Sequence, residues 1–556
     1  MVAVDRYRHS KIGVEIDKMK HLIFCREYPP APGGGIGTYA FLICHLLAEF
    51  GETVHVISQV WEGAEKTIQE ECNGRLIIHR IPFEDWTALH KPRPHPDLRS
   101  NIGRSLFNTE YYAQAFSWEA GLLAERLVDV EGIDLIEAQE YEAPLYHFLL
   151  RRALGEGPRR SPPCIVHLHS PTFFIASFND WDLNSPAILA ARRLEEYCIS
   201  AADALLCPSS FLAHQVQAHY GVEPGRIEVI PLPKEAGGRI RRAADTWVKG
   251  PICYIGRLER RKGLLEWIRA AVQIAQEAPQ AVFEFTGANI LGCNPIQSEF
   301  VLIEMIPRKL RSRFIFHGDQ PRQRIPEYLA RARIAAVPSR WENFPYSCIE
   351  AMSSGLPVLA TRQGGMPEMI RDRHTGWLAD QPTSEHLAQT LRRALETPPD
   401  RMAEMGRQAS NEIEQICGRE QVLEKQIEFR SRIALHPATR SLHLPVPESR
   451  LQMDEWRDGT IPEVLLERTG WLSPSPVNQG KRRTRKSGLK LIDVFKLARE
   501  HPAFFFEMVV WAFRQIKKRA SLTGLGHVSS QLGRLLGWEY RFGWFEKVRK
   551  ERSSHD

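Results

Sequence analysis

Short apolar runs alternate with longer amphipathic stretches along most of this chain, and no other feature limits its possible folds as much. A run of a few apolar residues followed by a helical pattern is typical of strand–helix–strand units, which build a parallel sheet covered by helices. The predicted strands of the first part are residues 21–25, 54–57, 135–136, 164–166, 204–206 and 227–230.

A segment rich in proline and glycine, residues 231–238, interrupts this pattern and is typical of a hinge between domains. The alternation then starts again, which predicts a second doubly wound domain of the same class. Its predicted strands are residues 252–255, 281–285, 314–316, 334–337 and 357–360. Two such domains that face each other leave a cleft at the carboxyl ends of their strands, where open α/β sheets bind ligands.

The fold class is therefore α/β, with two Rossmann-like domains at residues 1–235 and 245–415. We expect residues 416–435 to form a helix that packs back toward the first domain. Residues 436–556 are predicted to be a linker and a basic, mainly helical tail. Residues 471–556 contain eighteen Lys and Arg and seven Asp and Glu, which gives a net charge of +11. We favour a helical appendage for this tail and keep peripheral contact with an anionic membrane as the alternative; no nucleic acid is expected, because no recognition motif accompanies the charge.

Composition places the chain among ordinary globular proteins, with 43% hydrophobic and 25% charged residues in 556. Its ten cysteines occur singly and form no Cys-x-x-Cys pair, which favours reduced thiols over disulfides or zinc. We find no export signal and no run of about 18 apolar residues. These features predict a cytoplasmic protein, with contact at the inner face of the membrane left open through the tail.

Two carboxylates, Glu342 and Glu350, stand eight positions apart at a predicted loop-to-helix junction. A carboxylate accepts two hydrogen bonds at once and so suits the vicinal diol of a ribose or a hexose. This Glu-x7-Glu pattern resembles that of retaining glycosyltransferases of the GT-B fold, especially glycosyltransferase family 4 (glycosyl transferases group 1). The resemblance implies that Glu350 binds the ribose hydroxyls of the donor, that Glu342 contacts the transferred sugar, and that Phe344, Pro345 and Tyr346 line the donor site.

A second motif, residues 256–263, follows a predicted strand and opens a helix, and it resembles the diphosphate grip of the same family. Fixed cations beside a leaving diphosphate stabilise the charge that develops on it. Arg257 and Lys262 are the candidates for this role. We expect Arg260 and Arg261 to belong to a solvated basic turn.

Three further motifs fit the family at their positions. Gly364 and Gly365 would let the backbone approach the donor. Gly35, a further candidate donor contact, belongs to a glycine-rich loop, residues 32–40, that resembles the acceptor-side loop of the family. His169 matches a strand-end histidine beside the donor sugar, although His167, two residues away, leaves the choice open. Glu140 and Tyr141 are candidate acceptor contacts, and residues 61–117 resemble an insertion on the acceptor side.

The resemblance thus implies a retaining glycosyltransferase that uses a nucleotide-diphosphate sugar and needs no cofactor. The acceptor is open: a glycan, a lipid-linked sugar or a small molecule. Because basic residues would take the place of a divalent ion, we expect no metal site, and we attribute the Asp-x-Asp sequence at residues 180–182 to chance. A GT-B epimerase or phosphorylase, or a non-catalytic protein that binds sugar nucleotides, remains the alternative. A dehydrogenase is rejected, because no acid ends the second predicted strand.

Overall fold

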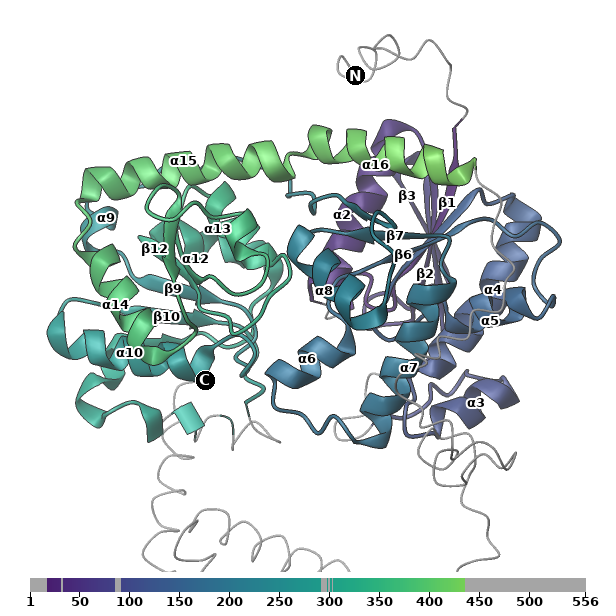
Figure 1. Ribbon diagram of the computed structural model, residues 1–556, viewed down its shortest axis with the longest axis horizontal. Helices are drawn as coiled ribbons and strands as arrows, with labels where there is room; N and C mark the ends of the chain where they lie inside the picture. The colour runs from purple at the N-terminus through teal and green to yellow at the C-terminus, as the bar shows by residue number, and fades with distance from the viewer. Residues whose placement is uncertain are drawn as a thin grey trace, which may run out of the picture. The chain divides into compact units, whose positions relative to one another are not determined.

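Two sheets organise the protein, as the alternating pattern predicts (Figure 1). The computed structural model describes residues 18–31, 34–85, 92–291, 298, 301–302 and 304–435. The first sheet has eight strands in the order β3-β4-β2-β1-β5-β6-β7-β8. Their bounds are β1 (Lys20–Phe24), β2 (Thr53–Gln59), β3 (Ile68–Glu71), β4 (Leu76–Ile81), β5 (Leu135–Gln139), β6 (Cys164–His167), β7 (Ala204–Cys207) and β8 (Ile227–Val229).

All neighbouring strands of this sheet are parallel except β3, which pairs antiparallel with β4 at the edge. Parallel strands need crossover helices, and these helices bury both faces of the sheet. The helices are α2 (Gly35–Phe50), α3 (Asn101–Phe107), α4 (Gln114–Glu131), α5 (Tyr146–Ala153), α6 (Thr172–Phe178), α7 (Pro186–Ala201) and α8 (Ser210–Tyr220), with a short turn η1 (Cys72–Gly74).

Residues 61–117 are not simply an insertion, which corrects the sequence-based expectation. Within them β4 pairs in parallel with β2, and β3 covers the outer edge of β4. Leu76, Ile78 and Ile81 are buried in β4, so this strand contributes to the core. The nearby prolines suggested irregular structure, but Pro82 comes directly after the strand has ended.

The second sheet has six parallel strands in the order β11-β10-β9-β12-β13-β14. Its strands are β9 (Ile252–Ile255), β10 (Phe283–Thr286), β11 (Phe314–Phe316), β12 (Ile334–Val337), β13 (Val358–Thr361) and β14 (Gly376–Ala379). The associated helices and turns are α9 (Thr246–Lys249), α10 (Leu264–Glu277), α12 (Ile325–Arg331), α13 (Tyr346–Ser353), α14 (Ser384–Leu395), η2 (Arg308–Arg313), η3 (Arg322–Arg324) and η4 (Met366–Glu368).

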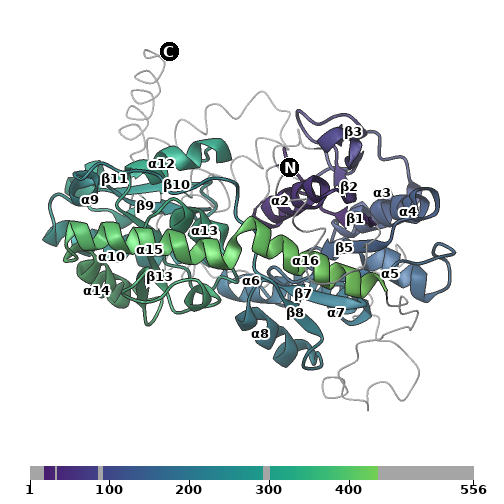
Figure 2. The same ribbon diagram turned by 90° about the horizontal axis from the view of Figure 1, so that it is seen from above.

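The last two described helices join the two sheets. Helix α15 (Pro399–Cys417) packs on α13 beside the second sheet, and α16 (Arg419–Ala434) packs on α2 and β5 of the first. Figures 1 and 2 show them as one green rod that continues from the second half of the protein, residues 245–415, to the first half, residues 18–235. Val422 and Phe429 of α16 are buried with Leu135 and Leu206, so the first core includes residues from the end of the described chain.

The chain crosses between the two halves at two neighbouring places. The backbone N–H of Lys234, in the predicted hinge, donates to the carbonyl of Cys417 at 2.8 Å. The two crossings therefore lie side by side, one on the way out and one on the way back.

The predicted linker and basic tail, residues 436–556, lie outside the described residues, as do Pro32 and Gly33 of the glycine-rich loop. Among the helices that the structure describes, none is both long and apolar enough to cross a membrane. The described cysteines are unpaired, and all of them except Cys72 are buried.

Candidate active site

The loop between β9 and α10 carries the predicted diphosphate motif. It leaves the strand at Gly256, whose φ of 143° is accessible to glycine, and enters the helix at Gly263, with a φ of 66°. A Cβ on Gly263 would lie 1.9 Å from the carbonyl oxygen of Pro338. Glycine thus allows this loop to pack directly against the segment that follows β12, which leads to Glu342.

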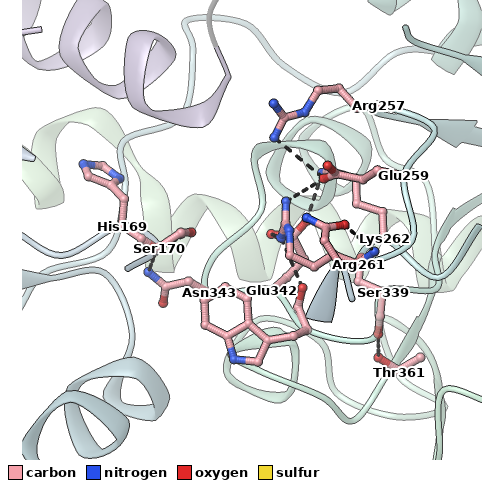
Figure 3. A network of polar contacts seen from close by, with 12 residues as sticks. His169, Ser170, Arg257, Glu259, Arg261, Lys262, Ser339, Glu342, Asn343 and Thr361 are labelled. Carbon is pink, nitrogen blue, oxygen red and sulfur yellow. Dashed lines mark hydrogen bonds and ion pairs between the residues drawn. The ribbon is translucent and has the colours of Figure 1, made fainter. Parts of the chain in front are cut away.

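Glu342 is buried between two cations from this loop (Figure 3). Its Oε2 lies 3.0 Å from Nη1 of Arg261, and its Oε1 lies 2.9 Å from Nζ of Lys262. Burial raises the pKa of the Glu342 carboxyl, but Arg261 and Lys262 outweigh burial and lower this pKa to about 2. Glu342 is therefore a fixed anion at physiological pH.

Arg261 is part of the site, which corrects its prediction as a solvated residue. Its guanidinium is buried and also contacts Oε1 of Glu259 at 2.8 Å, while its backbone N–H donates to Oδ1 of Asn179 at 3.0 Å. The sequence Arg260-Arg261-Lys262 gives no sign that the middle residue turns inward. Arg260, by contrast, is exposed as predicted, 3.7 Å from Asp180.

The two predicted phosphate-binding cations differ in their exposure to solvent. Lys262 is mostly buried against Glu342, whereas the side chain of Arg257 is 54% exposed and approaches Glu259 at 3.7 Å. Arg257, Glu259, Arg261, Glu342 and Lys262 thus form one chain of alternating charges, visible in Figure 3. The exposed guanidinium at the end of this chain is accessible to an anion from solvent.

The residues on either side of Glu342 bind the first half of the protein. Trp341 is buried, stacks on Phe174 and Phe178 of α6, and donates from Nε1 to Oε1 of Gln215 at 3.1 Å. Sequence reasoning missed this residue, although its place next to a candidate catalytic carboxylate was visible.

Asn343 joins two loops of the first half and was also missed. Its Nδ2 donates to the carbonyl of His169 at 2.8 Å, and its Oδ1 accepts from Oγ of Ser209 at 2.5 Å (Figure 3 shows Asn343 beside His169 and Ser170). Together, Trp341 and Asn343 fix Glu342 relative to His169.

Gly364 and Gly365 pack against the backbone of the Glu342 segment. A Cβ on Gly364 would lie 1.8 Å from the carbonyl oxygen of Glu342, and one on Gly365 would lie 2.0 Å from that of Asn343. The N–H of Gly365 also donates to the carbonyl of Glu342 at 3.0 Å. In this arrangement, the two glycines allow a close approach between two loops of the site.

Helix α13 brings Glu350 to the same edge of the second sheet. Phe344, Pro345 and Tyr346 are buried where the helix begins, and Gly35 of α2 lies next to Tyr346, since a Cβ on Gly35 would be 3.6 Å from the tyrosine ring. The Oε1 of Glu350 pairs with Nη2 of Arg322 at 2.7 Å. Burial raises the pKa of Glu350, and Arg322 and then Lys262 counteract it.

His169 follows β6 and lines a small pocket with Phe24, Tyr39 and Gln139. His167 is fully buried, and its Nδ1 lies 3.3 Å from Oε1 of Glu137. His169 is thus the histidine of the two that lines this pocket, and its place beside the donor sugar stays a prediction. Burial, and then His167, hold the pKa of His169 well below its usual value, so its imidazole is neutral.

Glu140 has a structural role and is not an acceptor contact as predicted. Its carboxyl is fully buried and accepts hydrogen bonds from the backbone N–H groups of His169 and Ser170. Burial raises its pKa to about 7. It shapes the loop that carries His169.

Within the described part of the chain, no three His, Cys, Asp or Glu side chains are grouped so that they could hold a metal ion. Asp180 of the Asp-x-Asp sequence is 3.2 Å from Arg340, in an ion pair that joins the two halves.

Two protein families match the two halves of the chain. Residues 33–233 match Glycosyltransferase Family 4, and residues 249–412 match Glycosyl transferases group 1. The protein is a GT-B glycosyltransferase of this group 1 and family 4 type. The predicted family and fold class are thereby confirmed, and Glu342, Glu350 and the 256–263 loop all lie in the segment that matches group 1.

Curated relatives of this glycosyltransferase include D-inositol 3-phosphate glycosyltransferases. The protein from Rhodococcus jostii is 23% identical over 394 residues, which cover 68% of this chain and 81% of the relative. The protein from Nocardiopsis dassonvillei is 28% identical over 382 residues, which cover 66% and 82%.

Solved structures of similar fold include sucrose-phosphate synthase from Thermosynechococcus elongatus, with a TM-score of 0.58 and 18% identity over 75% of this chain and 99% of that one. Anabaena Alr3699/HepE in complex with UDP-glucose gives a TM-score of 0.53 and 18% identity over 74% of this chain and 100% of that one. At such identities the likeness establishes the fold alone.

Proposed function

We propose that this glycosyltransferase moves a sugar from a nucleoside diphosphate sugar to its acceptor with retention of anomeric configuration and without a metal ion. The observation that carries the proposal is the Glu342 carboxylate held between Arg261 and Lys262. Glu350 lies in the helix that follows, and its ion pair with Arg322 leaves its second oxygen, Oε2, outside that contact.

In this proposal the donor binds along the second half of the protein. Glu350 accepts hydrogen bonds from the ribose diol, and Glu342 accepts them from hydroxyls of the transferred sugar, because an ionised carboxylate is an acceptor with two oxygens. Phe344, Pro345 and Tyr346 form the wall at the start of α13. A UDP-sugar is the first donor to test, since Alr3699/HepE was solved with UDP-glucose.

Arg257 and Lys262 would neutralise the diphosphate as the glycosidic bond breaks. Lys262 is already placed by Glu342, so its charge needs little reorganisation, and the exposed Arg257 can close over the phosphates. A leaving phosphate oxygen that accepts the proton of the incoming hydroxyl on the same face of the sugar gives retention. Neutral His169 can donate a hydrogen bond to the sugar from the other half of the protein.

The test is a transfer assay with UDP-, GDP- and ADP-sugars and a panel of acceptors that includes D-inositol 3-phosphate, the substrate in the names of the curated relatives. NMR of the product reads its anomeric configuration; inversion would contradict the retaining mechanism. Excess chelator should leave the rate unchanged, and a loss that magnesium restores would contradict metal independence.

Glu342→Ala is expected to lower kcat by about 10²–10³-fold, the usual effect of losing one preorganised polar group. The matched control is Glu327→Gln, an exposed glutamate of α12 that should leave kcat within twofold. Undiminished transfer by the Glu342 variant would exclude its catalytic role, and a wild-type protein that binds nucleotides but transfers no sugar would favour a non-catalytic binding protein.

A further inference from the structure

Arg322, in the short turn η3, makes three polar contacts, and no step of the proposed sugar transfer uses this residue directly. Its Nη2 pairs with Oε1 of Glu350 at 2.7 Å, its Nε donates to Oε1 of Glu235 at 2.6 Å, and its Nη1 donates to Oγ1 of Thr38 at 2.9 Å. The guanidinium also lies 5.7 Å from the ring centroid of Tyr346. One side chain thus contacts the second half, the hinge segment and the first half.

The contact with Glu350 affects how well this carboxyl can act as an acceptor. Only the ionised form offers all of its oxygen lone pairs to a diol; the protonated form is itself a donor. Burial disfavours the ionised form, and Arg322 is the strongest influence in the opposite direction, ahead of Lys262. Glu235, a nearby like charge, raises the pKa of Glu350 in the same direction as burial. Arg322 therefore favours the ionised form of the proposed ribose-binding group.

The contact with Thr38 connects the same guanidinium to the glycine-rich loop. Thr38 lies in the first turn of α2, three residues after Gly35, and its hydroxyl donates to the carbonyl of Gly34 at 3.2 Å. Gly35 itself lies against Tyr346. The start of α2 is thus held against the start of α13 through Arg322 and Tyr346.

We propose that Arg322 is a positioning residue that holds the Glu350 carboxyl group in place for the donor and ties the donor site to the acceptor-side helix α2. This inference rests on the proposed function, because it assigns Glu350 to the donor ribose. Arg322 touches neither reacting atom in this account. It acts through Glu350 on donor binding and through Thr38 on the alignment of the two halves.

The two contacts predict separable effects. Without Arg322, the main opposition to burial is lost and the pKa of Glu350 rises; Glu235, Lys262 and the phenol of Tyr346 remain around it. Nucleotide affinity should then fall as the pH is lowered, starting at a higher pH than in the wild type. Without the Thr38 hydroxyl, nucleotide affinity should persist while transfer slows.

The experiment measures the affinity of the full chain for UDP, GDP and ADP by calorimetry between pH 5 and pH 8.5, and continues with the tightest ligand. Arg322→Met is expected to weaken binding tenfold or more at pH 5.5 and much less at pH 8.5. Arg322→Lys keeps the positive charge and should restore most of the wild-type pH profile. The control is Arg324→Met, in the same turn, whose guanidinium pairs with Glu327 and Gln320, and it should behave as the wild type.

Thr38→Val provides the second measurement, with kcat expected to fall about tenfold and nucleotide affinity to stay within twofold. If the wild type binds no nucleoside diphosphate, or if Glu350→Ala binds as tightly as the wild type, the proposed donor site is wrong. If Glu350→Ala weakens binding but Arg322→Met has the pH profile of the wild type, the positioning role alone is wrong. A Thr38→Val variant with unchanged kcat would remove the coupling to α2.

Discussion

Replacing Arg430 with Met is expected to destabilise the first half of the protein by about 3–5 kcal/mol at neutral pH, the usual loss when a buried ion pair is broken from one side. Arg430 in α16 is fully buried and pairs with Glu137 in β5, whose side chain is only 2% exposed. After the change, Glu137 keeps the hydroxyl of Tyr39 at 2.9 Å and Nδ1 of His167 at 3.3 Å. These two groups compensate only in part for the missing cation.

The stability lost when Arg430 is replaced should be smaller at low pH than at high pH. Burial lowers the pKa of His167 from 6.5, Glu137 raises it and Arg430 lowers it, so removal of Arg430 raises this pKa. In the wild type, a folded pKa below the unfolded value near 6.5 costs stability as the pH falls below that value, and removal of Arg430 reduces this cost. Arg430→Met should therefore lose less stability at pH 5.5 than at pH 8.5.

Urea unfolding at the two pH values, followed by near-UV circular dichroism, measures both effects. Arg430→Met/Glu137→Gln should recover part of the loss, because it leaves no unpaired buried charge. The exposed Arg432 on the same helix pairs with Glu228, and Arg432→Met should change stability by less than about 0.5 kcal/mol. The reasoning is refuted if Arg430→Met stays within 1 kcal/mol of the wild type, or if its loss is equal at both pH values.

Three further predictions concern the segment around Glu342. Asn343→Ala should lower kcat by about 10–100-fold with unchanged nucleotide affinity, because the amide joins the halves without lying in the proposed donor site; an equal change in both quantities in kinetics and calorimetry would contradict this. Trp341→Phe should cost about 1–3 kcal/mol in urea unfolding through the lost hydrogen bond and ring volume, whereas the exposed Trp181→Phe should cost almost nothing. Gly365→Ala places a methyl group 2.0 Å from a carbonyl oxygen and should reduce kcat about 100-fold, while Gly238→Ala, with open space around it, should be neutral; similar rates for the two would exclude the steric argument.

The fold could be predicted from the sequence because its signal is local and repeated. Each strand and helix of a doubly wound domain carries its own period of apolar residues, and the loop–helix junctions at Gly263 and Tyr346 lie where the motifs place them. Strand β4 was missed because its six residues lie among prolines and polar stretches that resemble an insertion.

The candidate site was only partly predictable, for a physical reason. Glu342 and Lys262 belong to motifs, but their neighbours Arg261, Trp341 and Asn343 depend on contacts between segments far apart in the sequence. Asn343 lies 174 residues from His169. Local patterns carry no information on such pairs, so an arginine next to two other cations was predicted to be solvated when it is buried against two carboxylates.

The pairing of Arg430 with Glu137 across 293 residues also affects how the newly made chain folds. At synthesis rates of about 5–20 residues per second, roughly 15–60 s pass between the two residues leaving the ribosome. During that time Glu137, in the first sheet, lacks its partner Arg430. Domains generally fold in the order in which they are made, so the first half would begin to fold without this ion pair. The first half is thus translated first, but its buried ion pair is completed only after the second half has been made. Fragments that end before α16 should therefore depend on chaperones or aggregate.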